Sequence, residues 1–146
     1  MSSNDLSLYE KINGHEGLKK VHKIFYDKIY AHPWIGRFFK GLDQGYIENQ
    51  QTAFMSGLMG GPKTYQGKPL RYAHQHMFIP EALFELRQDL LRESLQEAEY
   101  EHALISAWLD LDSKFKHVIV KNSIEDCKKF YTHRQIVAYS ANGQGE

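Results

Sequence analysis

The sequence predicts an all-α protein built as one domain, and three observations support this fold class. Several windows repeat apolar residues at intervals of three and four, which is the spacing of one buried helical face. No window alternates apolar and polar residues over the length of a half-buried strand. The chain has 146 residues, which fits a single domain because domains hold roughly 100–200 residues. We therefore expect about six or seven helices around one core, without repeats or a coiled coil.

The first two expected helices occupy residues 5–12 and 15–31, and Asn13-Gly14 separates them. Asp5 is a candidate N-cap for the first helix. The buried face of the second helix should hold Leu18, Val21, Phe25 and Ile29.

Aromatic groups gather toward the end of the second helix. Tyr26 lies beside the buried face, and a buried tyrosine needs a partner for its hydroxyl group. His32-Pro33 should end the helix. A compact aromatic corner then follows, formed by Trp34, Ile35, Phe38 and Phe39.

The third expected helix, residues 44–59, carries an amide on an otherwise apolar face. Leaving the carboxamide of Gln51 buried without a partner costs about 1–3 kcal/mol, so it should form a hydrogen bond in the interior. The alternative is that Gln51 lies at the margin of the face and reaches solvent, as Gln50 should. The face consists of Ile47, Gln51, Phe54 and Leu58.

The stretch from Pro69 to Pro80 presents two histidines from a segment that holds at most about two or three helical turns. His74 and His76 would point about 200° apart on a helix, so one metal ion cannot take both. So short a helix buries little by itself, and a cofactor bonded to His74 would hold it in place. The alternative is that both histidines are ordinary surface or capping residues.

Three further helices are expected at residues 80–97, 98–121 and 124–138, and residues 140–146 should be disordered. The inner face of the first should hold Leu83, Leu86, Leu90 and Ser94 or Leu95. The inner face of the second should hold Ala103 or Leu104, Ala107 or Trp108, Leu111, Phe115 and Val118.

Composition and charge exclude several functional classes. Lysine and arginine total 18, as do aspartate and glutamate, which leaves no overall charge for nucleic acid or an anionic membrane. Cys127 is the single cysteine, which excludes a disulfide framework and a cysteine-based zinc cluster. No apolar run nears the ~20 residues that span a bilayer, and the N-terminus lacks the pattern of a secretion signal. We therefore expect a cytoplasmic protein without membrane insertion.

Motif spacing excludes further kinds of site. The sequence has no G-x-S-x-G elbow, Walker A loop, G-x-G-x-x-G turn or H-E-x-x-H pair. What remains is one candidate axial histidine, His74, with Tyr26 and Gln51 able to face the interior. Aromatic residues form 13% of the chain, a composition suited to enclosing a flat apolar group. Haem fits this set of residues better than other common cofactors.

Five motifs resemble the ordered motifs of the truncated haemoglobins, and most closely those of group I. They are YEKINGHEG, FY at 25–26, RFF at 37–39, GGP at 60–62 and KPLRYAHQ at 68–75. The resemblance covers about residues 6–121, which implies a globin domain over 1–121 and an extension, partly helical and then disordered, over 122–146. The implied fold is globin-like, a truncated two-over-two helical sandwich.

The chain departs from the group I pattern in places. Asn13-Gly14 replaces a double glycine, although asparagine tolerates left-handed backbone angles. The connection from His74 to the next helix is short, since Pro80 follows closely, and the C-terminal extension has no counterpart. His117 lies near where some members carry a histidine bonded to a haem vinyl group; a solvated histidine is the alternative.

The resemblance also implies roles for individual residues. His74 would be the proximal iron ligand of haem b, Tyr26 the distal tyrosine and Gln51 its partner. Ile47 would lie over the distal entrance, and Phe39 would pack on the haem face. Further pocket residues would be Phe25, Phe38, Phe54, Leu58, Tyr65, Leu70, Arg71, Met77 and Leu86.

The implied function is the binding of O₂, NO and CO, with nitric oxide dioxygenation as the first hypothesis. Tyr26 and Gln51 would stabilise O₂, and turnover would require an electron-donating reductase. Storage, delivery or sensing of O₂ without turnover is the second hypothesis. Peroxidase-like or sulfide-binding chemistry ranks lowest, because Ile47 is aliphatic and Arg37 belongs to the aromatic corner.

Overall fold

The computed structural model describes residues 6–67, 74, 77–121, 127 and 138–139, and the elements within them are helical, which confirms the all-α prediction. In chain order they are α1 (Leu8–Lys11), α2 (Gly14–Ala31), the 3-10 helix η2 (Ile35–Phe39), α3 (Gln44–Leu58), α5 (Glu81–Glu97), α6 (His102–Ser113) and α7 (Lys116–Ile119). Among these helices, none combines the length and apolar character that crossing a bilayer requires.

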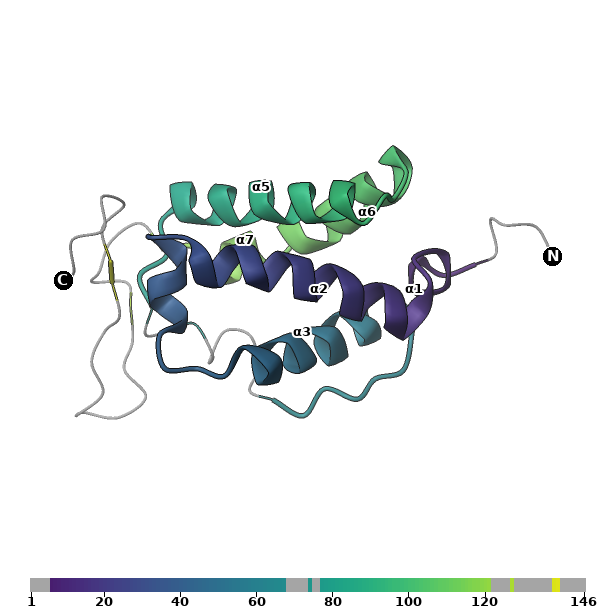
Figure 1. Ribbon diagram of the computed structural model, residues 1–146, viewed down its shortest axis with the longest axis horizontal. Helices are drawn as coiled ribbons and strands as arrows, with labels where there is room; N and C mark the ends of the chain where they lie inside the picture. The colour runs from purple at the N-terminus through teal and green to yellow at the C-terminus, as the bar shows by residue number, and fades with distance from the viewer. Residues whose placement is uncertain (1–5, 68–73, 75–76, 122–126, 128–137, 140–146) are drawn as a thin grey trace.

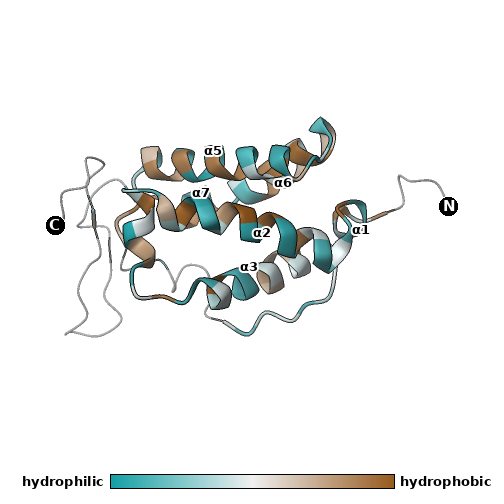
Figure 2. Ribbon diagram, viewed as in Figure 1, coloured by the Kyte–Doolittle hydropathy of each residue, from teal (hydrophilic) through white to brown (hydrophobic). Residues whose placement is uncertain are grey.

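Four helices form two packed pairs in a globin-like arrangement (Figure 1). α2 lies in the middle, with α3 packed along one side and α5 along the other, while α6 packs against α5. Figure 2 shows hydrophobic and hydrophilic residues alternating along α2 and α5, as expected for helices that bury one face. The largest buried core side chains include Leu18, Phe25, Met55, Phe84, Leu91 and Trp108.

The turn between α1 and α2 depends on close backbone contacts. Asn13 adopts a left-handed φ of 74°, which asparagine tolerates better than most residues. A Cβ atom at Gly17 would come within 1.8 Å of a backbone carbonyl oxygen at the end of α1, so this crossing requires glycine. The N-cap of α1 is Ser7, in a capping box with Glu10. The predicted cap, Asp5, lies outside the described residues.

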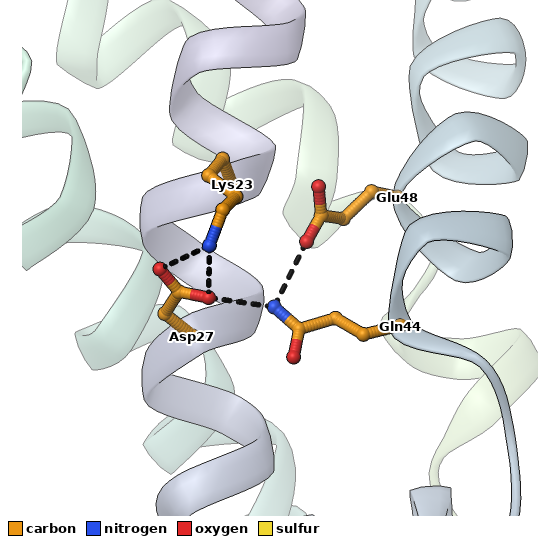
Figure 3. A network of polar contacts seen from close by, with 4 residues as sticks. All are labelled: Lys23, Asp27, Gln44 and Glu48. Atoms are coloured by element: carbon orange, nitrogen blue, oxygen red, sulfur yellow. Dashed lines mark hydrogen bonds and ion pairs between the residues drawn. The ribbon is translucent and has the colours of Figure 1, made fainter.

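A polar network holds the start of α3 against α2 (Figure 3). Nζ of Lys23 lies 2.7 Å from both carboxylate oxygens of Asp27. Nε2 of Gln44 donates to Asp27 at 2.7 Å and to Glu48 at 2.9 Å. Asp43 caps α3 through its side chain. These contacts fix the direction of α3, which carries several of the predicted site residues.

The helix predicted over residues 98–121 is two helices in the structure. α6 ends at Ser113 and α7 begins at Lys116, with a turn between them. The inner face predicted for this stretch was also wrong in part, because two of the buried positions of α6 lie one residue after the predicted ones. A buried aspartate breaks the apolar pattern on which the prediction depended. The buried residues of α6 are Ile105, Trp108 and Asp112.

Tyr139 of the C-terminal extension contacts the aromatic corner at η2. Nε1 of Trp34 donates to the Tyr139 carbonyl oxygen at 2.9 Å. The Tyr139 ring packs edge-on against Phe38 with centroids 4.9 Å apart, and the guanidinium carbon of Arg37 lies 4.7 Å from its centroid. The predicted helix and disordered tail of the extension fall almost wholly outside the described residues.

Candidate functional site

A cavity with mostly apolar walls lies between α2, η2, α3, α5 and the segment formed by α6 and α7. It brings together residues of these helices and of the connection between α3 and α5. The predicted site residues that line it are Tyr26, Phe38, Phe39, Ile47, Gln51, Phe54, Tyr65, His74 and Met77. The structure therefore assembles most of the predicted site around one space.

The remaining predicted pocket residues lie elsewhere. Phe25 is buried behind the site tyrosine, and their ring centroids are 4.9 Å apart. Leu58 is 38% exposed at the end of α3, and Leu86 packs against the core; neither lines the cavity. Leu70 and Arg71 lie outside the described residues.

His74 reaches the cavity from the connection between α3 and α5. Its backbone carbonyl oxygen accepts from Nζ of Lys121 at 2.7 Å and from the backbone N–H of Met77 at 2.9 Å. The backbone N–H of Lys121 donates in turn to the carbonyl oxygen of Ile79 at 3.0 Å. The chain just after α7 therefore holds the segment that carries the candidate iron ligand.

Tyr26 of α2 presents a protonated phenol to the cavity. Burial raises the pKa of Tyr26 to about 12, although the charge of nearby Arg87 opposes the shift. At neutral pH the hydroxyl group therefore keeps its proton and can donate a hydrogen bond. The ring packs edge-on against Phe25 and Phe39, with centroids 4.9 and 5.9 Å away, which fixes its orientation.

Gln51 of α3 is half-buried and lines the same cavity, so its amide lies at the cavity wall. Among the described residues, no hydrogen bond joins its carboxamide to Tyr26 or to another side chain. Gln50, by contrast, donates from Nε2 to the hydroxyl oxygen of Tyr46 at 2.8 Å. The Gln51 amide is therefore available to form a hydrogen bond with a ligand in the cavity. The predicted hydrogen bond between Gln51 and Tyr26 stays a prediction for the ligand-bound protein.

An ion pair in the cavity wall was missed by the sequence prediction. Arg87 of α5 and Asp112 of α6 both line the cavity, and Nη1 of Arg87 lies 2.7 and 2.6 Å from the two carboxylate oxygens of Asp112. The guanidinium carbon lies 5.3 Å from the ring centroid of Phe25 and 6.0 Å from that of Phe84. Burial lowers the pKa of Arg87, but the charge of Asp112 and the contact with Tyr26 raise it by more. The net shift is upward, so the group stays charged.

The sequence held one signal for this arginine. Arg87 lies four residues after Leu83 and four before Leu91, and both leucines are buried, so it shares their face of α5. A charge at such a position is usually solvated, and its partner here is 25 positions away on another helix. Only the packing of α5 against α6 shows that the two residues meet.

His22 joins α2 to α3 behind the cavity. Its Nδ1 lies 2.7 Å from Oγ1 of Thr52, and its ring packs edge-on against Trp108 with centroids 6.1 Å apart. Burial, assisted by the charge of Arg87, lowers the pKa of His22 to about 3. The ring is therefore neutral at neutral pH, and it holds together the two helices that carry Tyr26 and Gln51.

The residues around the cavity fit haem. Within the described part of the chain, no group of three or more His, Cys, Asp or Glu side chains could hold a bare metal ion. A single imidazole at an apolar cavity suits an iron ion that brings its own ring of nitrogen ligands. The aromatic side chains of Phe39, Phe54 and Phe115 suit the flat faces of such a ring.

Comparison with known proteins agrees with this chemistry. Residues 7–121 match the family model described as bacterial-like globin. The chain is 33% identical over 100 residues to a group 1 truncated hemoglobin of Tetrahymena pyriformis, an alignment that covers 68% of this chain and 83% of that protein. The chain belongs to the group I truncated haemoglobins.

Solved truncated haemoglobins share the fold. The Fe(III) form of the Tetrahymena pyriformis protein matches with a TM-score of 0.75 and 28% identity, covering 80% of this chain and 100% of that one. A 2/2 hemoglobin from Synechococcus, in the cyanomet state with covalently attached heme, matches with a TM-score of 0.70 and 27% identity, covering 77% and 94%. The predicted family and fold are thus confirmed.

Membership makes this truncated haemoglobin a haem protein that binds small diatomic ligands such as O₂. His117, considered above for a bond to a haem vinyl group, is exposed on α7 and does not line the cavity. Pro80 precedes α5 directly, as the short connection after His74 predicted, and Met77 and Ile79 of that connection line the cavity.

Proposed function

We propose that this protein holds haem b through His74 and, with Tyr26 and Gln51 retaining O₂, converts nitric oxide to nitrate. The observation that carries the proposal is the protonated phenol of Tyr26, which lines the same cavity as Gln51 and His74. The reaction joins O₂, NO and one electron to give nitrate, so a reductase must supply the electron. A cytoplasmic setting, where such reductases work, is part of the proposal.

Haem, when bound, supplies an iron ion that coordinates a diatomic ligand and exchanges electrons with it. His74 would contribute an imidazole nitrogen to that iron, and Lys121 holds the backbone that carries the imidazole. Tyr26 donates the hydrogen of its hydroxyl group into the cavity, where a polarised O₂ molecule is an acceptor. Gln51 adds an amide donor or orients the phenol. NO and CO would enter the same space, which Ile47 also lines.

The hydrogen bond from Tyr26 sets how slowly O₂ leaves. A bond of this kind in a cavity of low polarity contributes about 1–3 kcal/mol, which corresponds to tens of times in the dissociation rate. Slow release gives NO time to arrive before O₂ escapes. The amide of Gln51 should contribute in the same direction by a smaller amount.

Stopped-flow mixing of the O₂-loaded protein with NO tests the proposal. We expect fast formation of nitrate, and we expect Tyr26→Phe to release O₂ tens of times faster, because the donor is gone while the ring remains. The matched control is Tyr30→Phe, since Tyr30 lies one turn further along α2, donates to the Leu42 carbonyl oxygen at 3.1 Å and does not itself line the cavity. No fast nitrate formation, or an unaltered O₂ release rate in Tyr26→Phe, would contradict the proposal.

A second candidate function is O₂ storage, delivery or sensing without turnover. One observation favours it: Tyr139 of the extension contacts Trp34, Arg37 and Phe38, and Phe38 lines the cavity. A sensor needs such a link between its ligand site and a segment that faces a partner. The discriminating measurement is the rate at which a reductase restores the ferrous protein, because turnover requires that step and storage does not.

A further inference from the structure

We propose that the guanidinium group of Arg87 makes the cavity prefer small monovalent anions over neutral ligands. The inference rests on the proposed haem site, because a ligand in this space would also meet the iron ion. It gives a role in ligand preference to a residue that the sequence analysis did not single out.

The guanidinium group is fixed in the cavity wall rather than in solvent. It lines the cavity together with Tyr26, and the Arg87 side chain keeps 21% of its surface accessible. The faces of Phe25 and Phe84 lie within 5.3 and 6.0 Å of its central carbon. Asp112, which is only 6% exposed, holds one end of the group. A cation held in this way needs no reorganisation to meet a ligand.

Part of the guanidinium group is left for a guest molecule. Both hydrogen bonds to Asp112 leave from Nη1. An arginine has five N–H donors, so Nε and Nη2 keep three. Tyr26 is the other group beside the guanidinium, and a bond to its hydroxyl oxygen would take one of these donors and leave two. An anion in the cavity can therefore accept a charge-assisted hydrogen bond from a donor that is already in place.

The other charged and titratable groups near Arg87 decide the sign of the effect. Tyr26 and His22 are uncharged at neutral pH, since their pKa values are about 12 and about 3. Asp112 opposes an anion, but both of its oxygens already accept from Nη1. Gln88 donates to Asp112 as well, at 3.4 Å. The free N–H groups of Arg87 thus offer an anion hydrogen bonds that the carboxylate cannot offer, and a neutral ligand gains less from them.

A purely structural ion pair between α5 and α6 is the competing explanation. Buried ion pairs often contribute little net stability compared with apolar residues of similar volume. In that case, removing Arg87 changes the stability of the protein but affects anionic and neutral ligands alike. The ratio of the two affinities separates the explanations.

The test is an equilibrium spectral titration of the haem-loaded ferric protein, with azide and fluoride as anionic probes and imidazole as the neutral probe, at constant pH and ionic strength. We expect Arg87→Met to weaken azide and fluoride binding by about ten- to a hundredfold and imidazole binding by less than about threefold. Arg87→Lys should keep part of the preference. The matched control is Arg92→Met on the same helix, where Arg92 is exposed and pairs with Asp89 at 3.2 Å; it should change neither affinity.

Asp112→Asn gives the opposite sign and so excludes a structural role. It keeps an oxygen acceptor for Nη1 but removes the negative charge, so azide should bind about threefold more tightly or better. If Arg87→Met fails to fold because it leaves Asp112 unpaired, the double variant Arg87→Met/Asp112→Leu removes both charges and should show the same loss of azide binding. An unchanged ratio of azide to imidazole affinity in these variants overturns the inference.

The result of the anion titrations can be told apart from the result of the O₂ and NO experiments that test the proposed function. Azide and fluoride titrations use neither O₂ nor NO, and Tyr26→Phe tests O₂ release without changing Arg87. If Arg87→Met leaves the ratio of azide to imidazole affinity unchanged, the anion inference fails and the O₂ proposal still stands. A protein that takes up no haem would overturn both.

Discussion

Acidification should destabilise this protein through His22, by an amount that follows from its burial. The pKa of His22 falls from 6.5 in an exposed ring to about 3 in the folded protein, chiefly because of burial. A depressed folded-state pKa means that stability is fully present above pH 6.5 and is lost as the pH falls toward 3. Between pH 7 and pH 5 this one group should remove about 2 kcal/mol of the free energy of unfolding.

The assay is urea unfolding of the haem-loaded protein at both pH values, for the wild type and for His22→Gln. The variant keeps a side chain that can bond to Thr52 but cannot titrate, so its free energy of unfolding should fall by about 2 kcal/mol less over the same interval. Other groups, including the iron ligand, titrate in both proteins and cancel in the difference. His15→Gln, at an exposed position on α2, is the control and should follow the wild type. Equal pH dependence in wild type and His22→Gln would refute the reasoning.

Two further contacts around the cavity give predictions. Lys121→Met should speed the transfer of haem to a haem-free acceptor protein several-fold, because the carbonyl group of His74 loses a charged donor at 2.7 Å. Lys116→Met is its control, since that side chain pairs with an exposed glutamate, and equal rates in the two variants would contradict the role of Lys121. Tyr139→Ala should lower the thermal midpoint by about 2–8 °C, because about 1 kcal/mol of packing against Phe38 is lost; an unchanged midpoint would show that the extension does not support the corner.

Helical periodicity located α2 and α5 because each buries one largely apolar face. α3 differs, since its buried residues are Thr52, Met55 and Ser56, and most of its predicted buried face lines the cavity instead. The predicted helix over residues 15–31 is Gly14–Ala31, and that over 44–59 is Gln44–Leu58. The helix predicted at 80–97 is Glu81–Glu97. Each of these is bounded by a residue with a strong local preference, such as the proline before α5. The break between α6 and α7 has no proline or glycine to mark it, so sequence reasoning ran the two helices together.

The candidate site was predictable where its residues are unusual for their surroundings. A histidine in a short proline-bounded segment and a glutamine on an apolar face both stand out, and the structure places His74 and Gln51 at the same cavity. Arg87 and Asp112 did not stand out, because each is an ordinary surface residue type and their pairing depends on how α5 and α6 cross. Burial of a charge is a tertiary property, and a pattern within one helix does not contain it.

The central claim is that His74 holds haem in this cavity, and absorption spectra of the ferric, ferrous and CO-bound states test it most directly. The wild type should purify with haem and show the spectra of a histidine-ligated globin. His74→Gly should lose those spectra and regain them when imidazole is added, because free imidazole can replace the missing side chain. A colourless protein that refuses haem, or spectra that the His74→Gly substitution leaves unchanged, would contradict the claim.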